Sequence, residues 1–246
     1  MIDVSTRWTQ GAMILGWASL LAMGPAASCP AVVPPPTLPL PHTADPPPRD
    51  GIRVSLALGV GSPDLKRQML TGGAARGSYS PLEGLIVGAE VSGGGRYDLS
   101  ATATQVDVDS TVASRIFVGY GHWIFRQVIS LAGEIGLTPG LHSAYGGFLG
   151  PDATLSLTAG GVRWWALTLG YRFAYVTPTR PEKWASAVYH VIGLTALVPR
   201  HAKFGFFFQV GAHVGDVIRS RDLTVGVTGV AGFRFSLGLS GEPPHR

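Results

Sequence analysis

The chain has 246 residues and a formal net charge of +4, and only 14% of its residues are charged. Charged residues usually make up about a quarter of a soluble globular domain, so this composition argues against a typical cytosolic enzyme and against a disordered chain. The basic residues are spread along the sequence without an aromatic-rich basic cluster, which gives nucleic-acid binding little support. The single cysteine, Cys29, excludes a disulfide within the chain.

The N-terminal residues are typical of an export signal. Residues 12–24 form an apolar run that has the length of a signal-peptide core and is too short for a spanning helix. Ala26 and Ser28 provide the small side chains that a signal peptidase requires before its cleavage site. The sequence therefore predicts a signal peptide over residues 1–28.

Cys29 follows these small residues directly, an arrangement that resembles the lipobox of bacterial lipoproteins. The resemblance implies that Cys29 becomes the acylated N-terminus after cleavage. Ordinary cleavage without lipidation and an uncleaved segment are the alternatives. Residues 30–48 contain nine prolines, which disfavour helix and sheet and favour an extended chain. We expect residues 29–50 to form a periplasmic tether between the membrane anchor and the folded body.

From Gly51 onward, apolar residues alternate with small or polar ones. The first run has apolar residues at every even position from Ile52 to Val60, and the alternation recurs over 165–175, 204–214 and 225–237. A period of two gives a strand one apolar face. The runs are nine to twelve residues long, which suits a tilted strand that crosses the hydrocarbon layer of a membrane.

The pattern predicts ten antiparallel strands, with eight as the alternative because the third strand is weak. Their ranges are 52–61, 83–93, 97–106, 112–122, 127–138, 152–162, 166–176, 186–198, 203–214 and 223–239. Mostly longer connections over 62–82, 107–111, 139–151, 177–185 and 215–222 alternate with tight turns at 93–95, 123–126, 163–165 and 200–202. Long connections at one end and short, periplasmic turns at the other are typical of outer-membrane barrels.

Aromatic residues gather near the predicted strand ends, as expected at the two interfaces of a bilayer. Those assigned to the short-turn ends are Tyr97, Trp123, Trp164, Trp165 and Phe204, and those assigned to the long-loop ends are Tyr175, Trp184 and Tyr189. With this pattern, residues 51–239 resemble the small outer-membrane β-barrel proteins of Gram-negative bacteria. The resemblance implies an all-β, up-and-down transmembrane barrel that contacts outer-membrane lipids and uses the barrel-insertion machinery. Residues 240–246 are a polar tail, and a soluble all-β domain is the alternative.

Alternation also predicts which charged residues face the lumen. Six have inward parity: Arg53, Glu90, Arg115, Glu134, Arg172 and Arg234. One interpretation is an ion-pair network that fills a small barrel, because unpaired charge in a confined interior is costly. The other is the lining of a narrow channel, which an excess of arginine would bias towards anions.

A second basic set falls in the predicted long connections. Either these residues form a solvated rim, or they contact the phosphates of outer-leaflet lipopolysaccharide, since arginine binds phosphate in a bidentate manner. The residues are Lys66, Arg67, Arg76, Arg180, Lys183, Arg219 and Arg221.

Catalytic, metal and cofactor motifs have little support in the sequence. No metal-ligand spacing is present, and the glycine pairs at turns lack the helix that a phosphate-binding loop requires. His190 and His213 lie on neighbouring predicted strands, where a hydrogen-bonded lumen histidine is more common than a catalyst. His142 and Ser143, with Asp152, are the only local candidate for hydrolysis, and adjacent residues seldom face each other.

The sequence thus predicts the scaffold more sharply than the activity. The leading hypothesis is a non-enzymatic barrel lipoprotein of the outer membrane, with a structural or envelope-interaction role and no cofactor. The alternatives are a narrow, porin-like passive channel with a weak preference for anions and an outer-membrane lipid hydrolase.

Overall fold

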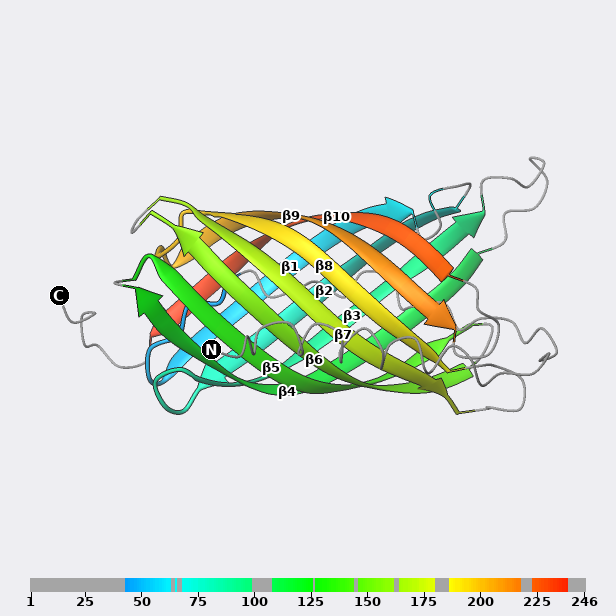
Figure 1. Cartoon of the computed structure of the whole chain (residues 1–246), viewed down its shortest axis with the longest axis horizontal. Coiled ribbons are helices and arrows are strands. Elements are labelled where there is room, and N and C mark those ends of the chain that lie inside the picture. The colour runs from blue at the N-terminus through cyan, green and yellow to red at the C-terminus, as the bar shows by residue number, and fades with distance from the viewer. Residues whose placement is uncertain are drawn as a thin grey trace, which may run out of the picture.

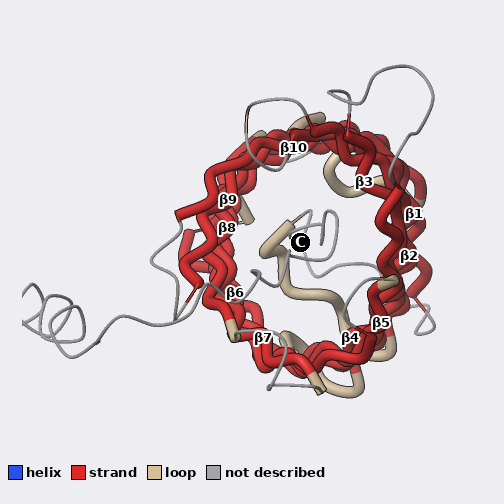
Figure 2. The backbone as a smooth tube through the Cα atoms, turned by 90° about the vertical axis from the view of Figure 1, so that its right-hand side faces the viewer, coloured by secondary structure: helices blue, strands red, loops and turns tan. Residues whose placement is uncertain are grey.

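A computed structural model describes residues 43–62, 65, 68–98, 108–125, 127–143, 146–161, 164–179, 186–217 and 223–238. In these residues ten strands form one closed antiparallel barrel (Figure 1). Each strand pairs with its neighbours in sequence, and β1 pairs with β10 to close the ring. Figure 2 shows the strands as a closed ring. The predicted all-β, up-and-down barrel of ten strands is confirmed. No helix among the described residues is long and apolar enough to cross a membrane.

The strands are 12 to 18 residues long. They are β1 (Gly51–Ser62), β2 (Gln68–Ser80), β3 (Leu85–Asp98), β4 (Val108–Phe125), β5 (Ile129–His142), β6 (Gly146–Gly160), β7 (Ala166–Pro178), β8 (Ala187–Val198), β9 (Phe204–Val217) and β10 (Leu223–Gly238). We call the left-hand end of the barrel in Figure 1 the terminal end, because β1 begins there and β10 ends there. The connections at the terminal end are 81–84, 126–128, 161–165 and 199–203.

The strand count matches the prediction, but two assignments behind it are wrong. β2 occupies residues that were predicted to be the long connection 62–82. The predicted turn at 93–95 lies inside β3, where it pairs with residues 71–73 of β2. Of the predicted strand 97–106, Tyr97 and Asp98 end β3, and the rest lies outside the described residues. The central sequence of β2, GGAARGS, places small residues where a visible apolar alternation needs bulky ones.

Two other predicted long connections are mostly strand. Residues 108–111 belong to β4. Within the predicted connection 139–151, only the residues between His142 and Gly146 lie outside a strand. Proline and glycine are typical loop residues, and that stretch contains both. Pro139 and Pro151 instead sit inside β5 and β6, where they pair with Leu149 and Leu137 respectively.

Side chains alternate between a polar interior and an apolar outer face. Along β6, Asp152, Thr154 and Ser156 are buried, whereas Leu155 and Leu157 between and beyond them are exposed. Other large apolar side chains on the outer face are also exposed, among them Leu58 at 75%, Ile116 at 63%, Ile135 at 64%, Phe208 at 66% and Val210 at 63%. A soluble protein does not leave so large an apolar surface in water. A closed barrel with this surface matches a bilayer instead, because it has no free edge and faces lipid with apolar side chains.

The aromatic residues follow the prediction only in part. Trp164 and Trp165 are exposed at the terminal end, beside which Phe204 begins β9. Tyr97 lies near the end of β3, at the end of the barrel opposite the terminal end. The prediction placed it at a short turn because β2 was missed and a turn was expected at 93–95. Trp123 contacts Arg200: the guanidinium carbon of Arg200 lies 5.2 Å from the centre of the Trp123 ring.

Candidate functional site

The register of five adjacent strands aligns a row of inward polar residues. Ser55 of β1 pairs with Arg234 of β10 on one side and with Arg76 of β2 on the other. Arg76 in turn pairs with Glu90 of β3, and Glu90 pairs with Arg115 of β4. Charged residues that are far apart in the sequence therefore become neighbours around one level of the barrel.

Part of this row belongs to what we call the central charge cluster, which consists of Arg76, Glu90, Arg115, Glu134, Asp152 and Arg172. Its middle is Arg115, which is 1% exposed. The Arg115 guanidinium donates to Asp152 through Nε at 2.9 Å and Nη2 at 2.6 Å, and to Glu134 through Nη1 at 3.0 Å. Thr138 also donates to Asp152, at 3.1 Å.

The other two arginines of the cluster complete its charge balance. Arg76 forms ion pairs with Glu134 and, at 3.3 Å, with Glu90. Arg172 lies 3.8 Å from Glu90 and donates to the hydroxyl of Thr154 at 3.1 Å. The cluster thus holds three arginines and three carboxylates. Such pairing offsets the high cost of removing charges from water.

Small residues make room for the cluster. A Cβ at Gly136 would lie 2.6 Å from Arg115 Nε and 2.9 Å from Asp152 Oδ2. The ring of Phe117 stacks under two cations, with its centre 4.0 Å from the guanidinium carbon of Arg76 and 4.8 Å from that of Arg115. A Cβ at Gly88 would collide with this ring. Glycine at these two positions is therefore part of the ion-pair geometry.

A second polar region lies inside the barrel at the terminal end, and we call it the terminal layer. It consists of residues 43–48 together with Arg53, Arg200 and Arg234. Figure 2 shows loop inside the ring of strands, and the contacts of Ala44 and Asp45 place this segment there. The backbone nitrogen of Ala44 donates to Thr158 of β6 at 2.7 Å. This part of the predicted tether is thus packed against the barrel interior.

The ion pair between Asp45 and Arg200 fixes the segment. Arg200 Nη2 and Nε donate to the Asp45 carboxylate at 2.6 and 2.9 Å, and Ser130 donates to it at 2.7 Å. The same guanidinium donates through Nη1 to the backbone oxygens of Val128 and Gly160. Burial alone would raise the pKa of Asp45, but the hydrogen bonds and the charge of Arg200 outweigh burial and hold that pKa below its ordinary value.

The six residues with predicted inward parity divide between the two regions. Glu90, Arg115, Glu134 and Arg172 lie in the central charge cluster, and Arg53 and Arg234 lie in the terminal layer. Sequence reasoning did not assign Asp45 or Arg200 to the interior. From the sequence, Asp152 was considered only as a possible hydrolytic partner of His142 and Ser143. Asp152 has the same inward parity in β6 as Thr154 and Ser156, so the alternation offered a signal for it.

The assignment of Arg76 to a lipopolysaccharide-contacting loop is wrong. Arg76 is in β2 and its side chain pairs with Glu90 and Glu134 inside the barrel. The error follows from the missed strand. The other residues of that set, and also Cys29, lie outside the described residues: Lys66, Arg67, Arg180, Lys183, Arg219 and Arg221.

The candidate hydrolytic residues do not form a relay through Asp152. Both Asp152 carboxylate oxygens are held by Arg115, and one also accepts from Thr138. The hydroxyl of Ser143 is 3.5 Å from Asp109 and accepts from the backbone nitrogen of Ser110. The two strand histidines are also separated: His190 contacts the hydroxyl of Tyr171 at 2.7 Å, whereas His213 is buried. No group of three or more potential metal ligands occurs among the described residues.

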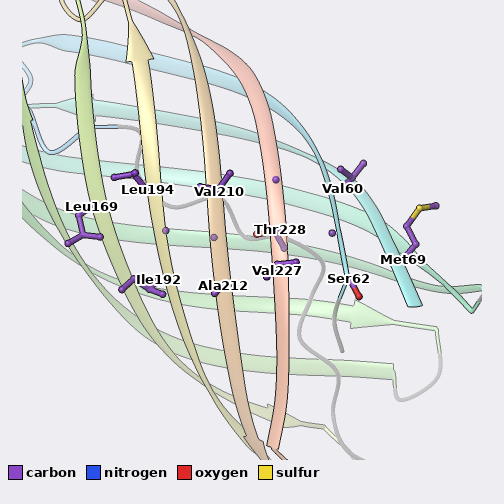
Figure 3. Close-up of a pocket in the computed structure, with 14 residues that line it drawn as sticks. Val60, Ser62, Met69, Leu169, Ile192, Leu194, Val210, Ala212, Val227 and Thr228 are labelled. Carbon is purple, nitrogen blue, oxygen red and sulfur yellow. The ribbon is translucent and has the colours of Figure 1, made fainter. Parts of the chain in front are cut away.

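The outer face carries a shallow apolar groove of about 800 Å³ (Figure 3). Leu194, Val210 and Val60 border it, and the small residues Gly229 and Ala212 leave it hollow. Most side chains along it are apolar, with Ser62 and Thr228 as the polar ones, so its chemistry is that of the surrounding lipid-facing surface.

The fold and the two buried polar regions define a class, a transmembrane β-barrel of the outer-membrane type with buried, paired charges inside. Neither a protein-family model nor a curated protein sequence matches the chain.

Solved structures that are similar to the chain include proteins of the bacterial outer membrane. One is the outer membrane protease OmpT from Escherichia coli, with 10% identity over 81% of this chain and 99% of that chain and a TM-score of 0.39. Another is outer membrane phospholipase A from Escherichia coli, with 11% identity, 79% and 99% coverage, and a TM-score of 0.35. Neisserial surface protein A has 8% identity, 75% and 95% coverage, and a TM-score of 0.34. By their names, these neighbours include two enzymes and a surface protein.

Proposed function

We propose that this protein is a closed, non-enzymatic barrel of the outer membrane with a structural or envelope-interaction role. The observation that carries the proposal is the pair of buried polar regions inside the barrel. The central charge cluster ties together side chains from β2 to β7, and the terminal layer adds the Asp45–Arg200 pair at one end. An interior held by buried, paired side chains offers no continuous polar path for ions.

The proposal is tested by permeability. Purified full-length protein is reconstituted into liposomes, and the rate of swelling in isosmotic solutions of small sugars is compared with that of protein-free liposomes. We expect equal rates. Swelling that increases with the amount of wild-type protein would overturn the closed-barrel proposal. Migration of unheated protein on a gel serves as the control that the reconstituted barrel is folded.

A narrow channel is the second candidate, and the surplus of buried cations favours it. The central charge cluster and the terminal layer together contain six arginines and four carboxylates. If the wild-type protein conducts, this surplus makes it prefer anions. The reversal potential across a salt gradient measures that preference, and it should shift towards cation selectivity in Arg53→Ala.

The absence of catalysis is part of the proposal. Its support is the engagement of both Asp152 carboxylate oxygens by Arg115, which commits that acid to the central charge cluster. Incubation with radiolabelled outer-membrane lipids should release no product. Product that disappears in Ser143→Ala would establish a hydrolase instead.

We further propose that the N-terminus is lipid-anchored at Cys29 and that the basic residues of the connections away from the terminal end bind lipopolysaccharide. The sequence before Cys29 supports the first part. Incorporation of a palmitate analogue by wild type but not by Cys29→Ala is the expected result.

For the proposed binding of lipopolysaccharide, Arg180→Ala combined with Lys183→Ala should weaken binding to lipopolysaccharide micelles.

A further inference from the structure

A small polar cavity separates the terminal layer from the central charge cluster. Its volume is about 40 Å³, and Thr43 and Pro47 of the N-terminal segment form part of its wall. The charged and hydroxyl-bearing strand residues around it are Arg53, Ser55, Arg76, Ser78, Glu134 and Arg234. A buried water needs roughly 10–15 Å³ by this measure, so the space admits about three waters or one small ion.

The strand register explains why these groups converge. Ser55 of β1 pairs with Arg76 of β2 and with Arg234 of β10, and Arg53, two residues earlier, pairs with Ser78 of β2. All five side chains have the same inward parity. Two hydroxyls and three guanidinium groups are thereby brought to one small region of the barrel interior.

The charged groups around the cavity differ in whether they form an ion pair. Arg76 and Glu134 pair with each other, and Glu134 also accepts from Arg115. Arg53 donates to the backbone oxygen of Asp45 at 2.8 Å, and Arg234 donates to the backbone oxygen of Arg200 at 2.5 Å. Within the described part of the chain, neither Arg53 nor Arg234 forms an ion pair with a carboxylate.

Arg234 also has a donor to spare. The residue is 4% exposed, and its Nε has no hydrogen-bond partner among the described residues. A buried, unsatisfied donor on a charged group is costly. Carbonyl oxygens and waters satisfy hydrogen bonds but do not neutralise the positive charge.

We propose that this cavity binds one small inorganic anion of halide size, held by Arg53 and Arg234 with the hydroxyls of Ser55 and Ser78. The anion offsets the charge that Asp45 leaves uncompensated and accepts from the free Arg234 donor. The cavity volume excludes larger organic anions such as gluconate. Glu134 does not compete, because its carboxylate is held by Arg76 and Arg115.

The test compares salts at equal ionic strength. Full-length protein in detergent micelles is unfolded by heat in sodium chloride and in sodium gluconate. A ligand that binds only the folded state at tenfold excess over its Kd raises the Tm by about 3–6 °C for a barrel of this size. We expect a saturable rise of this order with chloride and none with gluconate.

Matched variants locate the effect. Arg234→Gln removes the charge beside the cavity and should abolish the difference between the salts. Lys203→Gln removes a positive charge from an exposed residue at the same end of the barrel and should preserve it. Equal Tm values of wild type in both salts would overturn the proposal, as would an unchanged chloride effect in Arg234→Gln.

A second measurement needs no variant. Crystals of the wild-type protein grown in sodium bromide should show an anomalous-scattering peak inside the cavity, within contact distance of Arg234. Density for water alone, without an anomalous signal, would contradict the anion site even if Arg234→Gln fails to fold.

Discussion

The central charge cluster and the terminal layer fill the same barrel, but they are held in place differently. The cluster is built only from strand residues and balances three arginines with three carboxylates. The terminal layer depends on a non-strand segment and sets three arginines against Asp45. The cluster is fixed by the register, whereas the layer depends chiefly on the Asp45–Arg200 contact and retains surplus charge. The first is therefore suited to stability, and the second to ligand binding and to response to pH.

The largest effect is expected from Arg115→Ala. It removes the arginine that pairs with Asp152 and one of the two arginines that pair with Glu134, and breaking a buried pair in this way costs about 3–5 kcal/mol. The free energy of unfolding in urea, measured in lipid vesicles, should fall by that amount. Lys203→Ala, which removes an exposed charge, is the control and should change it by less than about 0.5 kcal/mol. A small effect of Arg115→Ala would mean that the cluster does not hold the interior.

Asp45→Asn should have the next largest effect and should sharpen the contrast with the cluster. It removes the charge opposite Arg200 while keeping the shape, at a cost of about 1.5–3 kcal/mol for hydrogen bonds to a charged group. Circular dichroism during urea unfolding measures the change. Equal stability of the variant and wild type at pH 7 would show that the Asp45–Arg200 pair contributes nothing.

The same variant tests a pH dependence. The folded-state pKa of Asp45 is below its ordinary value of 3.8, so its contribution to stability is complete above that value and is lost as the pH falls through the lower, folded pKa. Wild type should therefore lose stability relative to Asp45→Asn as the pH falls below about 4. Parallel stability curves for the two proteins would contradict this role of Asp45.

Gly136→Ala addresses the space within the cluster. The new Cβ would lie 2.6 Å from Arg115 Nε, so the Arg115–Asp152 pair must shift, and we expect a loss of about 1–3 kcal/mol. Gly133→Ala on the same strand is a matched control, because its Cβ would meet nothing closer than 4.0 Å. If both substitutions have the same effect, the loss comes from strand glycines in general rather than from the cluster.

The smallest effects are expected from removing one hydroxyl in each of the two regions. Thr138→Val removes a hydrogen bond to Asp152 in the cluster, and Thr158→Val removes the acceptor of the Ala44 backbone nitrogen in the terminal layer. Each should cost about 1 kcal/mol of unfolding free energy. Thr158→Val alone should also speed proteolysis of residues 43–48, whereas Thr138→Val should not.

Part of this interior could be predicted from the sequence because alternation has a short period. The inward parity of Glu90, Arg115, Glu134 and Arg172 follows from their bulky apolar neighbours on β3, β4, β5 and β7. Arg76 was missed because the glycine- and alanine-rich β2 shows too little apolar contrast for its parity to be read.

The terminal layer could not be predicted in the same way. Asp45 and Arg200 are 155 residues apart, and neither belongs to a strand, so no periodicity connects them. Their meeting depends on closure of the whole barrel. Pairing of β1 with β10 brings the start of β1 and the end of β10 together at the terminal end and leaves the segment before β1 beside the turn that carries Arg200.

The current carried by the wild-type protein in a planar lipid bilayer tests most directly whether the two regions close the barrel. Folded protein should insert without producing steady single-channel conductance in molar potassium chloride. Steady, uniform conductance steps from wild type, reduced by Arg53→Ala or Arg115→Ala, would contradict a closed interior and establish a channel through it.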